Sequence, residues 1–153
     1  MLGLFKKKPV NYFSEQEKKS VTQAIEKAEH RTSGEIRVFV ESHCRENDPV
    51  TRAKQVFQEL KMFQTAARNG VLVYVAMKDR KLAVFGDEGI HTKVGDTFWQ
   101  TEVNKMIAHF NSSNYTAGIT GIIGEIGEAL ATHFPYDAEG DTNELPDDIV
   151  FGK

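Results

Sequence analysis

Four polar residues of this 153-residue chain stand at the ends of predicted strands, where their side chains could converge on a ligand. They are Glu35, Arg68, Asn69 and Asp87. Carboxylate and amide oxygens are the ligands that Ca²⁺ and Mg²⁺ prefer, and a guanidinium binds phosphate or carboxylate groups through a planar fork. The residue types therefore predict a divalent-cation site beside an arginine that binds an anion or neutralises an acid.

Convergence of these residues depends on a β-hairpin and one further strand. Apolar, β-branched and aromatic runs at 71–76 and 82–85, separated by a few polar residues, are typical of two antiparallel strands. A strand at 35–41 precedes a helix, and a right-handed crossover makes it parallel to the strand at 71–76. This topology brings residues that are far apart in the sequence to one end of one sheet.

Two further acidic residues, Glu88 and Asp96, follow Asp87 closely enough to join the same site through a short connecting segment. The predicted metal ligands are Glu35, Asn69, Asp87, Glu88 and Asp96. Arg68 is the predicted substrate-binding residue. No catalytic residue is assigned, because the chain has no GxSxG elbow and no familiar phosphatase nucleophile loop. A hydrolytic reaction would therefore need a metal-bound water as its nucleophile.

Each candidate also has a purely structural interpretation. Asp87 is placed to cap a helix that begins at the next residue, and Glu35 is placed as a solvated residue at a strand end. Asn69 precedes a glycine, as in a turn that tolerates positive φ. His43 and Cys44 are interpreted as loop residues, since no acid or third ligand is predicted beside them. For Asp87, Glu35 and Asn69, the sequence leaves both the functional and the structural interpretation open.

Helices occupy the spaces around the predicted strands. Ser14 and Glu17 have the capping-box spacing, and the Asp48-Pro49 pair is typical of a helix start. A short helix at 88–94 is expected to end before Gly95, and two longer helices are expected over 96–110 and 115–133. The order helix, strand, helix, hairpin, helix, helix predicts an α/β fold. It favours a three-layer α/β/α sandwich around a small mixed sheet, with the hairpin strand antiparallel.

Composition narrows the classes of partner and compartment. The net charge of −3 gives no basic field for nucleic acid. A single cysteine, Cys44, excludes an intramolecular disulfide and a multi-cysteine zinc site. The apolar stretch 117–130 contains two glutamates and is too short to span a membrane, so it is interpreted as a core helix. A cytoplasmic protein without membrane contact is expected, although residues 1–8, apolar and then basic, leave contact with an anionic membrane surface open.

The domain organisation follows from the patterning. Residues 1–11 lack the hydrophobic segment of a signal peptide and are expected to form an N-terminal tail. Residues 12–136 form the expected domain. Residues 137–153 are acidic, and an extended or disordered C-terminal tail is expected. Docking of the apolar residues Leu145, Ile149, Val150 and Phe151 on the domain is the open alternative.

The chain resembles the TPM domain family, which is named from a thylakoid-lumen protein of photosystem II repair and has bacterial and animal relatives. The resemblance covers residues 12–136 and rests on the order of several short motifs. These are Ser33–Val38, Phe57, Leu60, Met62, Thr65, Arg68–Leu72, Gly86-Asp87, Gly89-Ile90, Phe98-Trp99, Met106, Phe110, Tyr115, Gly118 and Phe134-Pro135. The resemblance implies a Rossmann-like sandwich, a metal-binding rim and an acid-phosphatase activity proposed for the plant member. The family's polar rim falls on Glu35, Arg68, Asn69 and Asp87.

Many bacterial relatives add a signal peptide and a glycine-rich transmembrane tail, and this chain departs from that pattern. It resembles the stand-alone form, so extracytoplasmic and photosynthetic roles are not transferred. The first functional hypothesis is a divalent-cation (Ca²⁺ or Mg²⁺) binding module with a regulatory role. The alternative is a metal-dependent phosphomonoesterase acting on a phosphorylated small molecule or protein, in which Glu35 and Asp87 hold the ion and Arg68 holds the phosphate. A third hypothesis is an ion-independent interaction protein.

Overall fold

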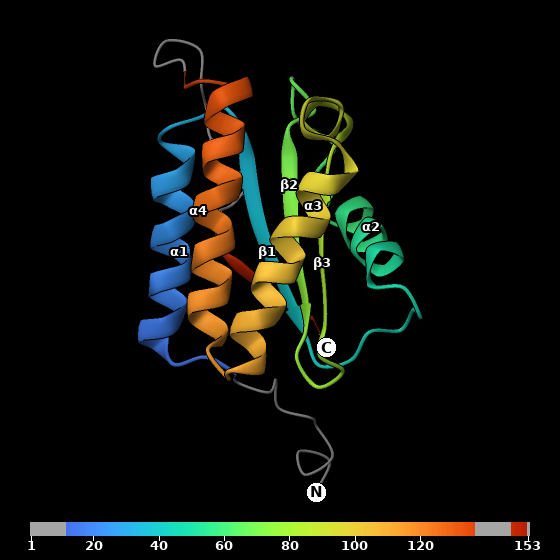
Figure 1. Ribbon diagram of the computed structural model, residues 1–153. Coiled ribbons are helices and arrows are strands. Elements are labelled where there is room, and N and C mark those ends of the chain that lie inside the picture. The colour runs from blue at the N-terminus through green and yellow to red at the C-terminus, as the bar shows by residue number, and fades with distance from the viewer. Residues whose placement is uncertain (1–11, 137–147, 153) are drawn as a thin grey trace, which may run out of the picture.

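A computed structural model describes residues 12–136 and 148–152 (Figure 1). The elements follow the predicted order, with one additional strand near the C-terminus. They are α1 (Glu15–Glu29), β1 (Glu35–Glu41), α2 (Pro49–Glu59), β2 (Gly70–Ala76), β3 (Lys81–Gly86), α3 (Glu88–Asn111), α4 (Tyr115–His133) and β4 (Ile149–Phe151).

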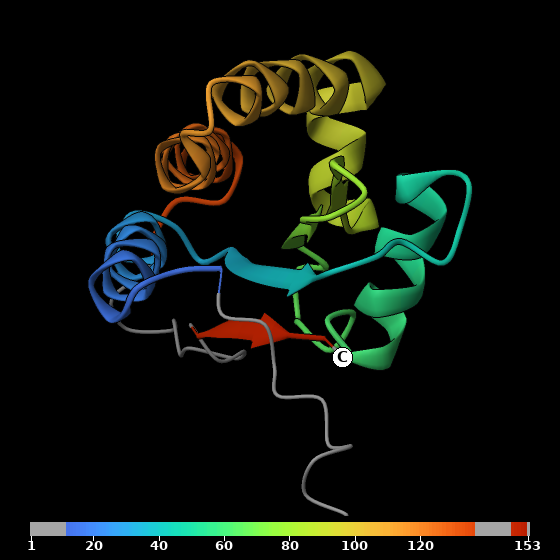
Figure 2. The same ribbon diagram turned by 90° about the horizontal axis from the view of Figure 1, so that it is seen from below.

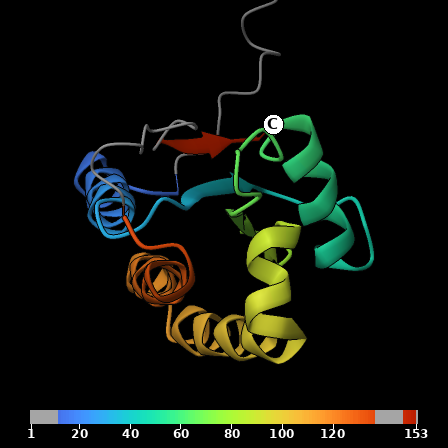
Figure 3. The same ribbon diagram turned by 90° about the horizontal axis from the view of Figure 1, so that it is seen from above.

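The four described strands form one mixed sheet in the order β3-β2-β1-β4. β1 is parallel to β2 and to β4, whereas β2 and β3 form the antiparallel hairpin. Side chains of α1, α3 and α4 pack on one face of the sheet, and those of α2 pack on the other. Figures 2 and 3 show these helices on their two sides of the sheet. The predicted three-layer α/β/α fold is thus confirmed.

The central strands are buried on both faces. All seven residues of β1 and all seven of β2 are buried, which agrees with their nearly continuous apolar sequences. Ile36 and Val38 pack toward α1 and α4, whereas Phe39 packs toward α2. Because β1 and β2 are parallel and adjacent, their first residues, Glu35 and Gly70, lie side by side at one end of the sheet.

Helix ends follow the sequence markers. Ser14 and Glu17 form the expected capping box at the start of α1, and the Asp48 side chain accepts from the Val50 N–H at the start of α2. The helical segments of α3 on either side of Gly95 are separated by its non-helical backbone, with φ of 77°. The predicted break at this residue is confirmed, and it lets the first turns of α3 lie against the end of β3.

Part of the C-terminal segment joins the sheet. Residues 149–151 form β4 beside residues 38–40 of β1, which corresponds to the docked alternative for this stretch. The expected N-terminal tail at 1–11 and residues 137–147 lie outside the described residues. Within 12–136 and 148–152, no helix has the length and apolar character needed to cross a membrane. The expected compartment stays a prediction.

Candidate functional site

The first residues of β1 and β2 meet the end of β3 at one end of the sheet. Glu35 is paired with Gly70, and the Glu35 N–H donates to the carbonyl of Asn69 at 3.4 Å. The Asp87 N–H donates to the carbonyl of Gly70 at 2.9 Å. Together with Arg68, these residues form the surface that we call the rim: Glu35, Arg68, Asn69 and Asp87. The structure therefore brings the four together from the elements that the sequence predicts.

Asp87 has two structural partners at the rim. Its carboxylate accepts two hydrogen bonds from Arg68, with Nε to Oδ2 at 2.7 Å and Nη2 to Oδ1 at 2.9 Å. It also accepts from the Glu88 N–H at 2.8 Å, so the capping interpretation of Asp87 is correct. This hydrogen bonding, followed by charge attraction, raises the pKa of Arg68. Asp87 is 4% exposed, whereas the Arg68 side chain is 41% exposed and has room to move away.

Asn69 is held by two hydroxyl groups. Its backbone N–H donates to Thr65 Oγ1 at 3.2 Å, and its Nδ2 donates to Ser33 Oγ at 3.4 Å. Its Oδ1 accepts no hydrogen bond from any residue of the described chain, although the side chain is buried. A side-chain carbonyl oxygen in this state is suited to a hard cation. Ser33 and Thr65 were not among the predicted site residues. Their hydroxyl-bearing side chains shortly before β1 and β2 are the feature of the sequence that could have identified them.

Two of the structural interpretations are wrong in detail. Glu35 is 2% exposed and so is not a solvated residue at a strand end. The positive φ expected at the turn before β2 lies on Arg68, at 52°, rather than on Asn69. Arg68 has this left-handed backbone conformation, and its side chain forms the ion pair with Asp87. Both differences concentrate polar groups at the rim.

The remaining two predicted ligands lie in more exposed places. Glu88 is 71% exposed in its side chain, and its Oε1 lies 3.2 Å from Nη1 of Arg68. Asp96 is 96% exposed and lies 3.4 Å from Nε2 of His91, whose Nδ1 accepts from Trp99 Nε1 at 2.9 Å. Among the residues described, no three His, Cys, Asp or Glu side chains are grouped as a metal centre. The role of the five residues as ligands stays a prediction.

Two of the four rim residues, Arg68 and Asp87, line a groove between α2 and α3. The groove has a volume of about 780 Å³, and Leu82–Gly86 of β3 line it together with Arg68 and Asp87. Trp99 of α3 lies against Gly86, where an added Cβ would approach its ring to 2.3 Å. A pocket of this volume is in the range used by small-molecule ligands.

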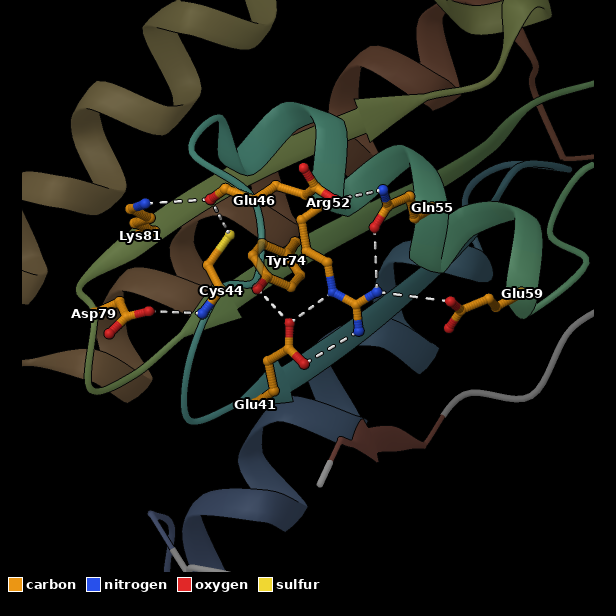
Figure 4. A network of polar contacts seen from close by, with 9 residues as sticks. All are labelled: Glu41, Cys44, Glu46, Arg52, Gln55, Glu59, Tyr74, Asp79 and Lys81. Atoms are coloured by element: carbon orange, nitrogen blue, oxygen red, sulfur yellow. Dashed lines mark hydrogen bonds and ion pairs between the residues drawn. The ribbon is translucent and has the colours of Figure 1, made fainter.

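The opposite end of β1 carries a buried polar network (Figure 4). Arg52 donates to both carboxylate oxygens of Glu41, from Nε at 2.9 Å and from Nη2 at 3.2 Å, and the Tyr74 hydroxyl donates to the same carboxylate. Burial, followed by the hydrogen bond with Glu41, raises the pKa of Tyr74. Because Glu41 and Arg52 satisfy each other and are at most 4% exposed, this network is a closed structural ion pair rather than an open site.

His43 and Cys44 lie beside this network and have local partners. His43 Nδ1 is 2.9 Å from Asp79 Oδ1, and the Cys44 thiol donates to the Glu46 carbonyl at 3.2 Å. The premise that no acid lies beside these residues is wrong, because Asp79 contacts both. The Cys44 thiol donates to a backbone carbonyl rather than to the imidazole, so the two residues are still interpreted as parts of a loop.

The fold and the rim define an α/β/α domain with a polar site at the amino ends of two parallel strands. A sequence profile of the TPM domain matches residues 7–129, so the chain belongs to the TPM domain family. The NMR structure of the BA42 protein from the psychrophilic bacterium Bizionia argentinensis has a TM-score of 0.85 and 41% identity to this chain. The match covers 95% of this chain and 99% of that one.

Two more distant structures share the fold. The N-terminal domain of the cg2496 protein from Corynebacterium glutamicum has a TM-score of 0.61 at 15% identity, covering 82% of this chain and 86% of that one. The N-terminal domain of a protein from P. gingivalis has a TM-score of 0.64 at 16% identity, covering 82% of each chain. A search of curated proteins gave no match.

Proposed function

We propose that this chain binds a divalent cation, Ca²⁺ or Mg²⁺, at the rim and acts as a binding or regulatory module. Glu35, Asn69 and Asp87 would supply oxygen ligands, and Glu88, whose carboxylate lies 3.2 Å from Arg68, would add a fourth. Asp96 was predicted as a further ligand, but its carboxylate lies beside His91 and is not assigned to the ion. Hard cations take six or more oxygens, so water and backbone carbonyls would complete the shell.

The observation that carries this proposal is the side-chain oxygen of Asn69. It is buried, it accepts no hydrogen bond within the described part of the chain, and it belongs to a residue whose backbone contacts Glu35. A buried acceptor without a donor costs about 1–3 kcal/mol, and a cation would remove that cost. Two carboxylates that are each less than 5% exposed, Glu35 and Asp87, supply the negative charge that the ion requires.

Arg68 competes with the ion for Asp87. A guanidinium that makes two hydrogen bonds to Asp87 occupies the oxygens that a cation would use. Because 41% of the Arg68 side chain is exposed, it can turn toward Glu88 or into water when an ion binds. Removing Arg68 should therefore leave metal affinity intact or raise it.

Isothermal titration with Ca²⁺ and Mg²⁺ tests this assignment. Asp87→Asn keeps an oxygen for the Glu88 N–H but removes a formal charge, so affinity should fall at least about tenfold, with Glu35→Gln behaving alike. Arg68→Ala should bind as well as the wild type or better. Asp79→Asn, the same change at the other end of the sheet, is the matched control and should be neutral. Unchanged affinity in both rim carboxylate variants would contradict the proposal.

A phosphomonoesterase is the second candidate, and the groove favours it. Arg68 and Asp87 line the groove with His91, so an arginine suited to phosphate lies where a small substrate has room. A bound divalent ion would supply a nucleophilic water and neutralise charge on the phosphoryl group. The chain's own residues would hold the ion through Glu35 and Asp87 and orient the phosphate through Arg68.

The two candidates separate in an assay with a generic phosphomonoester, with and without EDTA. Glu35→Gln and Arg68→Ala should each abolish turnover if the chain is the enzyme, whereas a copurifying phosphatase would be unaffected by either change. Absence of turnover in the wild type at saturating metal would leave the binding module as the function.

A further inference from the structure

β3 is an edge strand whose free side forms the floor of the groove. Its other side pairs with β2, and no described strand pairs beyond it in the order β3-β2-β1-β4. The consecutive residues Leu82–Gly86 line the groove, with α2 on one side and α3 on the other. Figure 3 shows α2 and α3 on either side of this edge. Residues 82–86 therefore border the groove between the two helices, although Leu82, Ala83 and Val84 are each at most 6% exposed.

The pairing of β2 and β3 determines which backbone groups face the groove. The Asp87 N–H donates to the Gly70 carbonyl, so the pair formed by these residues is a hydrogen-bonded one. In an antiparallel ladder such pairs alternate with non-hydrogen-bonded pairs. The N–H and C=O groups of Leu82, Val84 and Gly86 consequently point away from β2 and toward the groove. An edge of this kind is a template for an added strand.

Both walls of the groove carry apolar side chains. Val103 and Ile107 of α3 lie on one wall, and Val50 and Phe57 of α2 lie on the other. Val50 is 48% exposed and Ile107 is 39% exposed, which places them among the few large apolar side chains that the described chain leaves in water. Apolar side chains that alternate up and down from an added strand would contact both walls.

The charges around the groove are mainly negative once the Arg68–Asp87 pair is set aside. Lys81, the first residue of β3, donates from Nζ to the carbonyls of Glu46 and Asn47. Asp48 is the next residue, so it lies near the start of β3. Glu88 lies beyond the other end of β3. Lys54 and His91 are the other basic residues on this lining, Lys81 Nζ lies beside Asp48, and Asp96 adds a further carboxylate. An occupant with basic residues at both ends would complement this pattern.

We propose that the groove binds an extended peptide segment, with a short apolar centre and basic flanks, by adding it to the sheet as a strand beside β3. Backbone hydrogen bonds to Leu82, Val84 and Gly86 would supply affinity, and the apolar walls would select the central side chains. This binding uses the free edge of β3 rather than the rim oxygens, but Glu88 and Asp96 on the groove lining are also predicted metal ligands, so the peptide is tested in the absence of metal.

The probe is a synthetic peptide of sequence KKVLVKK, acetylated and amidated, titrated into ¹⁵N-labelled full chain in EDTA. Amide shifts should centre on residues 82–86 and spread to 50–58 and 99–107. N-methylation of alternate residues removes the backbone N–H donors from one edge of the peptide strand only, so affinity should change less than about twofold. N-methylation of every residue removes the donors from both edges and should weaken binding at least about tenfold. The acidic peptide EEVLVEE should bind at least about tenfold more weakly.

A variant of the groove wall provides the second readout. Ile107→Lys places a cation on an exposed position of the wall and should weaken binding of the basic peptide at least about tenfold without unfolding the domain. Gln23→Lys is the control: it also replaces a neutral side chain with lysine, but on α1, which does not line the groove. This variant should bind the peptide like the wild type. Equal binding of the fully methylated peptide, shifts centred on β4, or absence of binding at millimolar peptide would overturn the proposal. Groove shifts that appear on concentrating the protein alone would assign the groove to a second copy instead.

Because the titration is done in EDTA, its outcome does not depend on a metal ion. Loss of metal binding with retained peptide binding would refute only the proposed cation site. Retained metal binding without peptide binding would refute only the strand-addition site.

Discussion

Replacing Glu102 with glutamine should remove a pH-dependent part of the stability of the domain. Glu102 of α3 is 4% exposed, and its Oε1 lies 3.5 Å from Nζ of Lys105. Lys105 in turn lies 2.9 Å from Oε1 of Glu125 on α4. Burial, followed by hydrogen bonding with Glu125, raises the pKa of Glu102 from 4.5 to about 7. The folded chain therefore keeps this proton at pH values where the unfolded chain has lost it.

The sign of the effect follows from this raised pKa. An acid of this kind stabilises the folded state fully below its unfolded pKa and loses that contribution as pH rises through the folded value of about 7. The difference between the two pKa values corresponds to at most about 3 kcal/mol. Lys105 and Glu125 are 53% and 42% exposed, and solvent screening at these partners reduces the expected effect to about 1–2 kcal/mol. Glutamine is uncharged throughout and keeps its contribution.

Urea unfolding at pH 5 and pH 8, followed by the fluorescence of Trp99, measures the effect. Between these pH values the wild type should lose about 1–2 kcal/mol more stability than Glu102→Gln. Glu128→Gln changes an exposed glutamate on α4 in the same way and should follow the wild type. Parallel pH profiles for the wild type and Glu102→Gln would refute the reasoning.

Substitutions at three further residues give quantitative stability predictions. Arg52→Ala should cost about 3–5 kcal/mol in urea unfolding, because Glu41 would be left buried without its cation; a cost below about 1 kcal/mol, typical of a surface pair, would contradict this. On α4, Gly121→Ala should stabilise the domain by up to about 1 kcal/mol, since nothing lies within 4 Å of the added Cβ. The same change at Gly127 should destabilise, because the Cβ would lie 2.7 Å from that of Ala28, and equal melting temperatures for the two variants would argue against this packing.

The sequence predicted the elements whose ends carry chemical markers. The capping box at Ser14, the Asp48-Pro49 pair and the break at Gly95 all depend on local backbone chemistry, and each lies where it was expected. The hairpin and the right-handed crossover then determined which strand ends meet. These rules brought Glu35 and Asp87 to the same end of the sheet without any knowledge of side-chain packing.

Features that depend on tertiary packing could not be derived from the sequence. The burial of Glu35 results from the strands and helices around it, and a charged residue at a strand start carries no sign of this. The left-handed backbone of Arg68 and its two hydrogen bonds to Asp87 carry no marker in the sequence. Asp96 lies near His91 because of the turn at Gly95, whereas its sequence position suggested the rim. Three residues at 149–151 show no periodicity, so their pairing with β1 was open.

The central claim, that the rim binds a divalent cation, is tested most directly by an NMR titration of the ¹⁵N-labelled wild type with Ca²⁺ and with Mg²⁺. Cation binding at the rim predicts that the amides of Glu35, Asn69 and Asp87 shift together with one saturating affinity, because a shared ion contacts all three residues. Shifts confined to the acidic segment after residue 137, with the rim amides unchanged at saturating metal, would contradict it.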